Sequence, residues 1–348
     1  MILLLHSIEG WNDWFLNDNF YFSNFYFNQL VNNLGIGVDA FFLISGFLIT
    51  YLLLEEKKRF NSISIKDFII RRSLRIWPLY FLLILITPIL ISFSNFESPH
   101  YLANIFFYGN FDTIINQEWT FPFAHFWSIH VEEHFYLICP LIITFVPLKH
   151  LLKVFLVIIF LSISFRIYIY NSIEYSWFQL YLNTLSRVDV IVLGCIGGLY
   201  YSRKAFQIKM KRIYSLLILA LLILFLCIEP VSLWDSWWKA GFKKYIYLIP
   251  IIILMLNYNF NNEFKRIAFF PKLFTYLGSL SYGIYMISNI ILVPFLVLFK
   301  EFEINSILLF ILCNIVFTIL AAAMSYKFVE KPFLRIGKKF SKVKSKKV

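Results

Sequence analysis

Residues 126–136, Phe-Trp-Ser-Ile-His-Val-Glu-Glu-His-Phe-Tyr, bring together a serine, two histidines and two glutamates directly before an apolar run. In a helix, His130, Glu133 and His134 would share one face, and Glu132 and Tyr136 another. Ionisable groups that enter a bilayer are expensive and need a partner or a function. The stretch therefore predicts either a polar reaction or binding site, or an interfacial helix start where Glu132 and Glu133 favour the positive end of the helix.

Two further ionisable residues lie in apolar surroundings near the N-terminus. His6 follows four apolar residues, and it could act as a general base, since histidine titrates near neutral pH, or be a neutral histidine bonded inside a bundle. Asp39 lies in a glycine-containing apolar segment, residues 35–50. Glycines allow close helix approach, so Asp39 is expected either to face the bundle interior or to cap a helix at the membrane surface.

Three arginines precede another apolar run. Arg71, Arg72 and Arg75 would cluster on one helical face. Guanidinium groups bind phosphates in a bidentate way, so this cluster predicts a phosphorylated ligand. The alternative is a topology anchor that touches lipid headgroups.

Other charged candidates lie at the ends of apolar runs. Arg187 and Asp189 begin one such run and could pair with each other or with Glu132, Glu133 or Asp39. Glu330 ends the last run among lysines, where it is either functional or part of a surface ion pair.

The composition identifies the class of protein that must position these groups. Of the 348 residues, 60% are hydrophobic and 15% are charged, and the mean hydropathy is +0.72. Soluble domains are about 45–50% apolar and about 25% charged, so the chain is predicted to be an integral membrane protein. None of the four cysteines has metal-ligand spacing, so we expect four core cysteines and no metal site. No cleavable signal peptide is visible.

Apolar runs separated by polar connections predict an all-α, polytopic helix bundle of ten spans. Residues 1–7 are too short for a span, and we expect them either to be the tail of a first span that begins upstream or to form only a partial helix. The other spans are expected at 35–54, 76–93, 129–147, 154–170, 188–202, 213–228, 245–258, within 273–299, and at 304–326. This predicted transmembrane domain covers residues 1–340, and residues 341–348 form a basic tail.

The distribution of basic residues predicts the topology. Alternate connections hold 26 of the 32 Lys and Arg, namely 55–75, 148–153, 203–212, 261–272 and 327–348. By the positive-inside rule, these connections and both termini are cytoplasmic. The net charge of +12 is thereby explained without nucleic acid as a partner, and membrane lipids are the expected surroundings.

Seven stretches, taken together, resemble one known family. In chain order they are His6-Ser7 and residues 35–50, 71–80, 126–140, 187–194, 277–285 and 325–333. They are similar to motifs of the acyltransferase-3 family of integral membrane acyltransferases, which includes bacterial O-antigen and peptidoglycan O-acetyltransferases. The similarity covers nearly the whole chain, and the joint match is far more specific than any single motif.

The resemblance implies a reaction and roles for the candidate residues. It implies acyl transfer from cytoplasmic acyl-CoA, usually acetyl-CoA, to a hydroxyl of a surface glycan or lipid-linked sugar, with no permanently bound cofactor. By matching position, His6 resembles the catalytic base, and the three arginines resemble the donor-side cluster. Glu132, Glu133 and Glu330 resemble functional carboxylates. The cell's cytoplasmic membrane is the implied location.

Two departures from the family pattern and two alternative functions accompany this interpretation. The family has a basic residue upstream of the histidine, beyond Met1, and it often has a histidine where this chain has Ser288. The carboxylate that would assist His6 is one of Glu132, Glu133, Asp39 and Asp189. The alternatives are a membrane transporter or flippase, since buried charges also mark transport pathways, and an inactive relative of the family.

Overall fold

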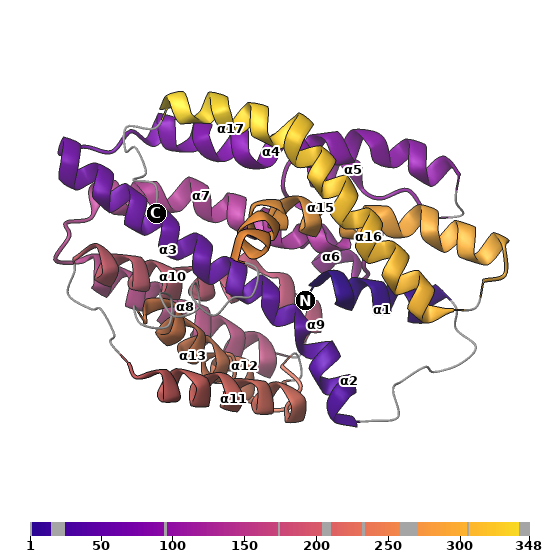
Figure 1. Ribbon diagram of the computed structural model, residues 1–348. Coiled ribbons are helices and arrows are strands. Elements are labelled where there is room, and N and C mark those ends of the chain that lie inside the picture. Colours follow the sequence, from indigo (N-terminus) through magenta and orange to yellow (C-terminus); the bar gives the residue numbers. More distant parts are fainter. Residues whose placement is uncertain are drawn as a thin grey trace. The chain divides into compact units, whose positions relative to one another are not determined.

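Helices form the regular elements throughout the part of the chain that the computed structural model describes (Figure 1). The described residues are 2–14, 25–93, 96–172, 175–203, 210–231, 234–257, 271–304 and 306–340. The predicted all-α class is confirmed for these residues. The predicted basic tail, 341–348, lies outside them.

The chain divides into two compact units, and each is described by itself. Unit 1 comprises residues 1–25, 69–130 and 272–341, and unit 2 comprises residues 26–68, 131–271 and 342–348. Two of the boundaries, at 68/69 and 130/131, fall inside continuous helices, α4 (Ile65–Ser92) and α7 (Trp127–Phe145).

Unit 1 is built largely from long apolar helices. In addition to most of α4 and the start of α7, it contains α1 (Ile2–Trp14), α5 (Tyr101–Ile105), α6 (Gly109–Asn116), α15 (Pro271–Glu301), α16 (Ile307–Ser325), the π-helical turn η3 (Tyr326–Glu330) and α17 (Lys331–Gly337). In Figure 1 the indigo α1 lies beside α16, and these two helices pack against each other.

Unit 2 is centred on the packing of α3 (Ile36–Phe60) against α10 (Thr184–Ser202), with α8 (Leu151–Asn171) on the other side of α10. It also contains α2 (Phe25–Asn32), α9 (Trp177–Leu182), α11 (Arg212–Ile228), α12 (Trp237–Phe242) and α13 (Tyr245–Leu256).

Glycines set the close approach of α3 and α10. A Cβ added to Gly46 of α3 would lie 1.9 Å from the Ile191 carbonyl oxygen, and one added to Gly194 of α10 would lie 2.1 Å from the Leu43 carbonyl oxygen. Only a residue without a side chain allows the two backbones to lie this close. The prediction that glycines around Asp39 permit close helix packing is confirmed.

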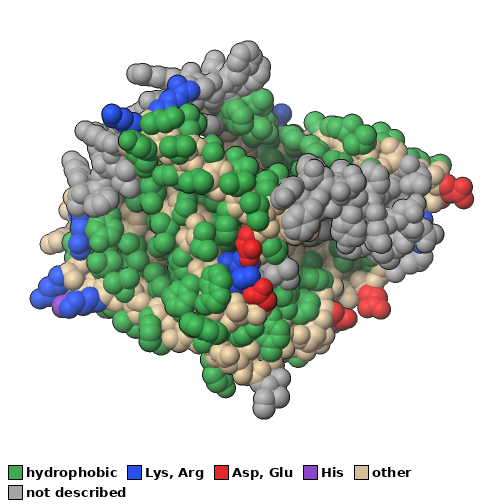
Figure 2. Space-filling view, turned by 90° about the horizontal axis from the view of Figure 1, so that it is seen from below, with side chains coloured by type: hydrophobic (Ala, Val, Ile, Leu, Met, Phe, Trp, Pro, Cys, Tyr) green, Lys and Arg blue, Asp and Glu red, His purple; other side chains and the backbone are tan. Residues whose placement is uncertain are grey.

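The helices agree with a multi-pass membrane protein. Within the described residues, six helices are long and apolar enough to cross a membrane by length and composition, namely Gln29–Phe60, Ile65–Ser92, Leu151–Asn171, Trp177–Ser202, Leu273–Glu301 and Ile307–Phe340. Large hydrophobic side chains are exposed on α8 and α11, and Figure 2 shows a face on which hydrophobic side chains predominate. The other predicted spans coincide with α1, α7, α11 and α13, which are shorter or more polar, so ten spans and cytoplasmic termini stay predictions.

The connection predicted between the second and third spans is largely helical. Residues 55–75 were expected to form a connection, but α3 continues to Phe60 and α4 begins at Ile65. Glu, Lys and Arg are good helix formers, so the charged segment extends both helices. The three arginines therefore lie in the body of α4.

Candidate functional site

His6 lies in unit 1, where α1 places it against α15. Its Nδ1 is 2.9 Å from the hydroxyl oxygen of Ser288. The Ser288 hydroxyl donates its own proton to the Tyr285 carbonyl at 2.8 Å, so its oxygen is the acceptor for His6. Nδ1 of His6 must then carry the hydrogen, and Nε2 keeps a lone pair in the neutral ring. A general base needs a nitrogen with such a lone pair.

Polar contacts fix α1 as well as the ring. The fully buried Ser7 donates to the Leu3 carbonyl at 2.7 Å and accepts from the Asn314 amide of α16 at 2.7 Å. The helix is thus tied to α16 one residue away from His6. These bonds hold the imidazole ring of His6 in one position and orientation.

A second histidine, His125, lies beside His6 and was missed by the sequence analysis. The ring centroids are 5.5 Å apart in an edge-on arrangement. His125 Nε2 lies 3.0 Å from the Met286 carbonyl, to which it donates. Burial lowers the pKa of His125 to about 4 although the carbonyls of Met286 and Pro122 favour the charged ring. The signal available in the sequence was a histidine immediately ahead of the Glu-Glu stretch.

His130, by contrast, has a structural role in unit 1. Its Nδ1 accepts from the Asn110 backbone N–H at 3.1 Å, so Nε2 carries the hydrogen and donates to the Tyr80 hydroxyl at 2.9 Å. Tyr80 in turn donates to the Asn104 carbonyl at 2.7 Å. Gly109 leaves room for the ring, because a Cβ there would lie 2.6 Å from His130 Cε1.

The two glutamates of this stretch belong to unit 2, on α7. Both are 9% exposed. The Tyr136 hydroxyl donates to Glu132 Oε2 at 2.9 Å, which confirms that these two residues share a helical face, and Ser45 Oγ is 2.8 Å from the same hydroxyl. His134 Nδ1 is 2.9 Å from Thr184 Oγ1. The roles predicted for Glu132 and Glu133 stay predictions.

Asp39 faces the interior of unit 2, and its predicted partner is found. Arg187 Nη1 lies 3.1 Å from Asp39 Oδ1, and the Tyr247 hydroxyl donates to Oδ2 at 2.7 Å. Asp189 pairs instead with Arg166 at 2.9 Å and with Lys244 at 2.6 Å. Asp39 is therefore no surface cap, and Arg187 does not pair with Asp189.

Arg166 and Lys244 were missed by the sequence analysis, although one signal was present. Arg166 interrupts the apolar α8, and an ionisable residue inside a span is a functional or pairing candidate by default. Lys244 ends a connection that holds other lysines, so nothing in the sequence distinguished it.

The candidate donor-side groups, Arg71, Arg72 and Arg75, lie on the part of α4 that belongs to unit 1. Arg71 and Arg72 are half-buried and Arg75 is exposed. Arg71 donates to the Phe340 carbonyl, and the charge of Arg75 acts on Glu330. The structure thus brings the arginines and Glu330 to the same end of unit 1.

Glu330 differs from the surface ion pair considered as its alternative. It is 5% exposed, and its Oε1 lies 3.4 Å from Ser325 Oγ. The same oxygen would be 2.9 Å from a Cβ added at Gly283. Among the described residues, Glu330 has no ion-pair partner within 4 Å.

Comparisons of the sequence with known proteins find one family model and several relatives. The model of the Acyl_transf_3 family, described as an acyltransferase domain, matches residues 1–326. O-acetyltransferase OatA of Staphylococcus aureus strain NCTC 8325 is 28% identical over 328 residues, which cover 87% of this chain and 53% of that protein. SACOL0978 of Staphylococcus aureus strain COL, whose name as an O-acetyltransferase is provisional, is 30% identical over the same coverage.

The chain thus spans about half the length of the curated relatives it matches. No solved structure matches it significantly.

Proposed function

Because the chain belongs to the Acyl_transf_3 family of acyltransferases, we propose that it is a membrane O-acyltransferase that moves an acyl group, most simply acetyl, from acyl-CoA to a hydroxyl of a surface glycan or lipid-linked sugar. The observation that supports this most directly is the tautomer of His6. Its Nδ1–H is held by Ser288, which leaves Nε2 as a base. The relatives' names describe O-acetyl transfer.

His6 has a defined part in the proposed reaction. The acceptor hydroxyl oxygen attacks the thioester carbonyl carbon while Nε2 of His6 takes the hydroxyl proton. The carbon–sulfur bond then breaks, and the imidazolium returns the proton to the departing CoA thiolate. Ser288 accepts from Nδ1–H throughout, so it keeps the ring oriented as the charge appears and disappears.

The arginines on α4 are the proposed donor site. CoA is a polyanion, and guanidinium groups form charge-assisted, bidentate bonds to phosphate. Arg71 and Arg72 are half-buried, which reduces solvent screening of their charges relative to exposed side chains. We place this end of unit 1 at the cytoplasmic side, where acyl-CoA is available, because most basic connections are assigned to that side.

The base assignment is tested with His6→Ala and a matched control, His150→Ala, at an exposed histidine. Cells without surface O-acetylation of their own would express each form, and base-labile acetate on the cell envelope would be measured. Loss of a general base costs about 10²–10⁴-fold, so we expect acetylation to disappear in His6→Ala and persist in the control. Retained acetylation at equal protein level would refute the role of His6.

The donor assignment is tested by acetyl-CoA binding to purified protein. Arg71→Ala/Arg72→Ala should abolish binding, whereas His6→Ala and the control Lys149→Ala/Lys153→Ala should keep it. A folded parent that binds no acetyl-CoA would instead favour the transporter or the inactive relative.

A further inference from the structure

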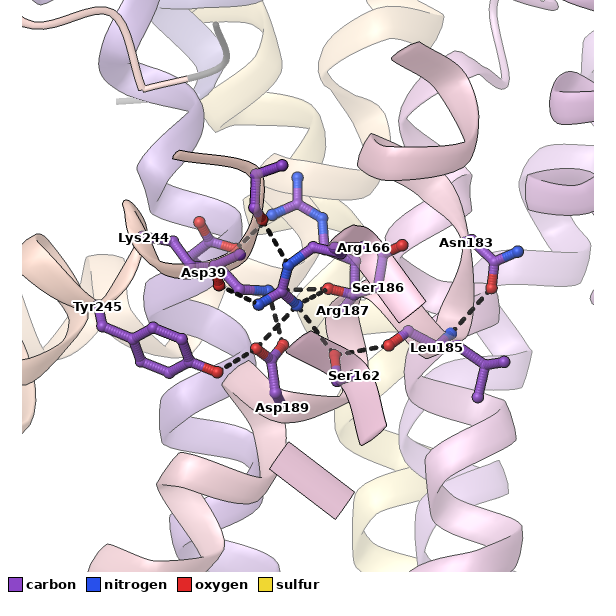
Figure 3. A network of polar contacts seen from close by, with 12 residues as sticks. Asp39, Ser162, Arg166, Asn183, Leu185, Ser186, Arg187, Asp189, Lys244 and Tyr245 are labelled. Atoms are coloured by element: carbon purple, nitrogen blue, oxygen red, sulfur yellow. Dashed lines mark hydrogen bonds and ion pairs between the residues drawn. The ribbon is translucent and has the colours of Figure 1, made fainter. Parts of the chain in front are cut away.

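Unit 2 contains a buried cluster of five charged side chains from four parts of the chain (Figure 3). Asp39 comes from α3, Arg166 from α8, Arg187 and Asp189 from α10, and Lys244 from the residue before α13. None is more than 8% exposed. In the figure these side chains point toward one another between the helices.

The charges in this cluster do not balance among the described residues. Three cations face two carboxylates: Asp39 pairs with Arg187, and Asp189 pairs with both Arg166 and Lys244. The two cations that share Asp189 make their other bonds to neutral groups, such as the Ala240 and Gly241 carbonyls for Arg166 and the Ser186 carbonyl for Lys244. A buried charge that lacks a counter-charge is strongly destabilising.

A cavity of about 40 Å³ lies against the cluster. All three cations line it, whereas of the two carboxylates only Asp39 does. About 10–15 Å³ is enough to hold one water molecule, so the cavity accommodates a small ion or a carboxylate group. Tyr181, Trp234 and Tyr247 contribute aromatic walls.

The imbalance has two physical remedies. One is a neutral Lys244, whose pKa is lowered to about 7 by burial and by the charges of Arg166 and Arg187, against the opposing effect of Asp189. The other is a bound anion, which would supply the missing negative charge and keep Lys244 protonated. The cavity favours the second remedy, because it lies where the cations outnumber the carboxylates three to one.

We propose that this cavity is a binding site for one monovalent anionic group, either a free ion of chloride size or the carboxylate of an acidic sugar. In both cases Arg187 and Lys244 supply the positive charge and Asp39 restricts the site to a single negative charge. The proposal does not depend on acyl transfer, since binding is measured without the reaction.

The test uses the purified full chain in detergent at constant ionic strength. Thermal unfolding would be followed while the sodium salt of a bulky sulfonate buffer, which has no carboxylate, is replaced by sodium chloride, acetate or glucuronate. A ligand at 100 times its Kd is expected to raise Tm by a few degrees, and above Kd the rise should follow the logarithm of the ligand concentration. A response to chloride alone identifies a free-ion site, and a stronger response to glucuronate than to acetate identifies an acidic sugar.

Lys244→Gln is the matched variant, because it balances the cluster and keeps a side-chain donor. We expect the affinity of this variant for the anion to be at least tenfold lower than that of the parent. Lys300→Met, at an exposed lysine, should keep the affinity of the parent. An unchanged anion response in Lys244→Gln overturns the proposal. The parent protein also tests the proposal if the variant does not fold. A Tm that is the same in all anions at pH 6 and pH 8, or one that rises linearly and not logarithmically with anion concentration, overturns the proposal.

Discussion

The substitution Gly46→Ala tests the packing on which unit 2 depends. The added Cβ would lie 1.9 Å from a backbone carbonyl oxygen, that of Ile191, whereas contacts under 3.0 Å essentially never occur. The helices α3 and α10 must therefore separate by at least about 1 Å, since a backbone oxygen cannot rotate away. Overpacking by one methyl group costs about 1–3 kcal/mol, and we expect the upper end of this range here.

The control for this prediction is the same substitution at Gly278, in α15. Nothing lies within 4 Å of a Cβ added there. Replacing this glycine by alanine then changes only the helix propensity, which raises the free energy of unfolding by up to about 1 kcal/mol. The same gain applies at Gly46, so the net loss expected there is about 2 kcal/mol.

The assay is equilibrium unfolding in mixed detergent micelles, with the parent and both variants compared. The free energies of unfolding of the two variants should differ by about 3 kcal/mol, with Gly278→Ala the more stable. Equal stabilities within about 0.5 kcal/mol would refute the close approach of α3 and α10. The same separation would stretch the 3.1 Å bond between Asp39 and Arg187, so Gly46→Ala is also expected to weaken anion binding.

Three other predictions follow from particular contacts. Ser288→Ala removes the acceptor that holds His6 Nδ1–H, so kcat for acetyl transfer should fall about 10–100-fold while acetyl-CoA binding is unchanged; an unaltered kcat contradicts the tautomer argument. His125 has its pKa lowered to about 4, so its neutral form is the native one and stability is lost as pH falls from about 6.5 to about 4, by about 3 kcal/mol in full. Thermal unfolding of the parent and of His125→Gln at pH 7.5, 6, 5 and 4 measures this, and equal pH slopes would contradict it. Arg187→Met leaves Asp39 buried without its cation and should lower the free energy of unfolding by about 3–5 kcal/mol, whereas Asp39→Asn/Arg187→Met should lower it clearly less. Chemical unfolding that finds the double variant less stable than Arg187→Met would contradict this reasoning.

The sequence by itself determined the class of protein and the candidate chemistry. Long apolar runs indicate membrane helices, because a helix satisfies its own backbone groups in the bilayer, and the helices fall where the apolar runs predict them. Local spacing was also sufficient for contacts within one helix, such as Tyr136 to Glu132, because residues four apart share a face. The ordered motifs led to the family whose model matches residues 1–326.

Only the tertiary structure decided which ionisable groups meet. That Asp39 needs a partner follows from its apolar surroundings, but the choice of Arg187, 148 positions away, depends on the register in which α3 packs against α10. The assignment of Ser288 to His6, 282 positions away, depends in the same way on how α1 packs against α15. A buried charge shows in the sequence that it must be compensated, whereas the identity of the compensating group is a property of helix packing.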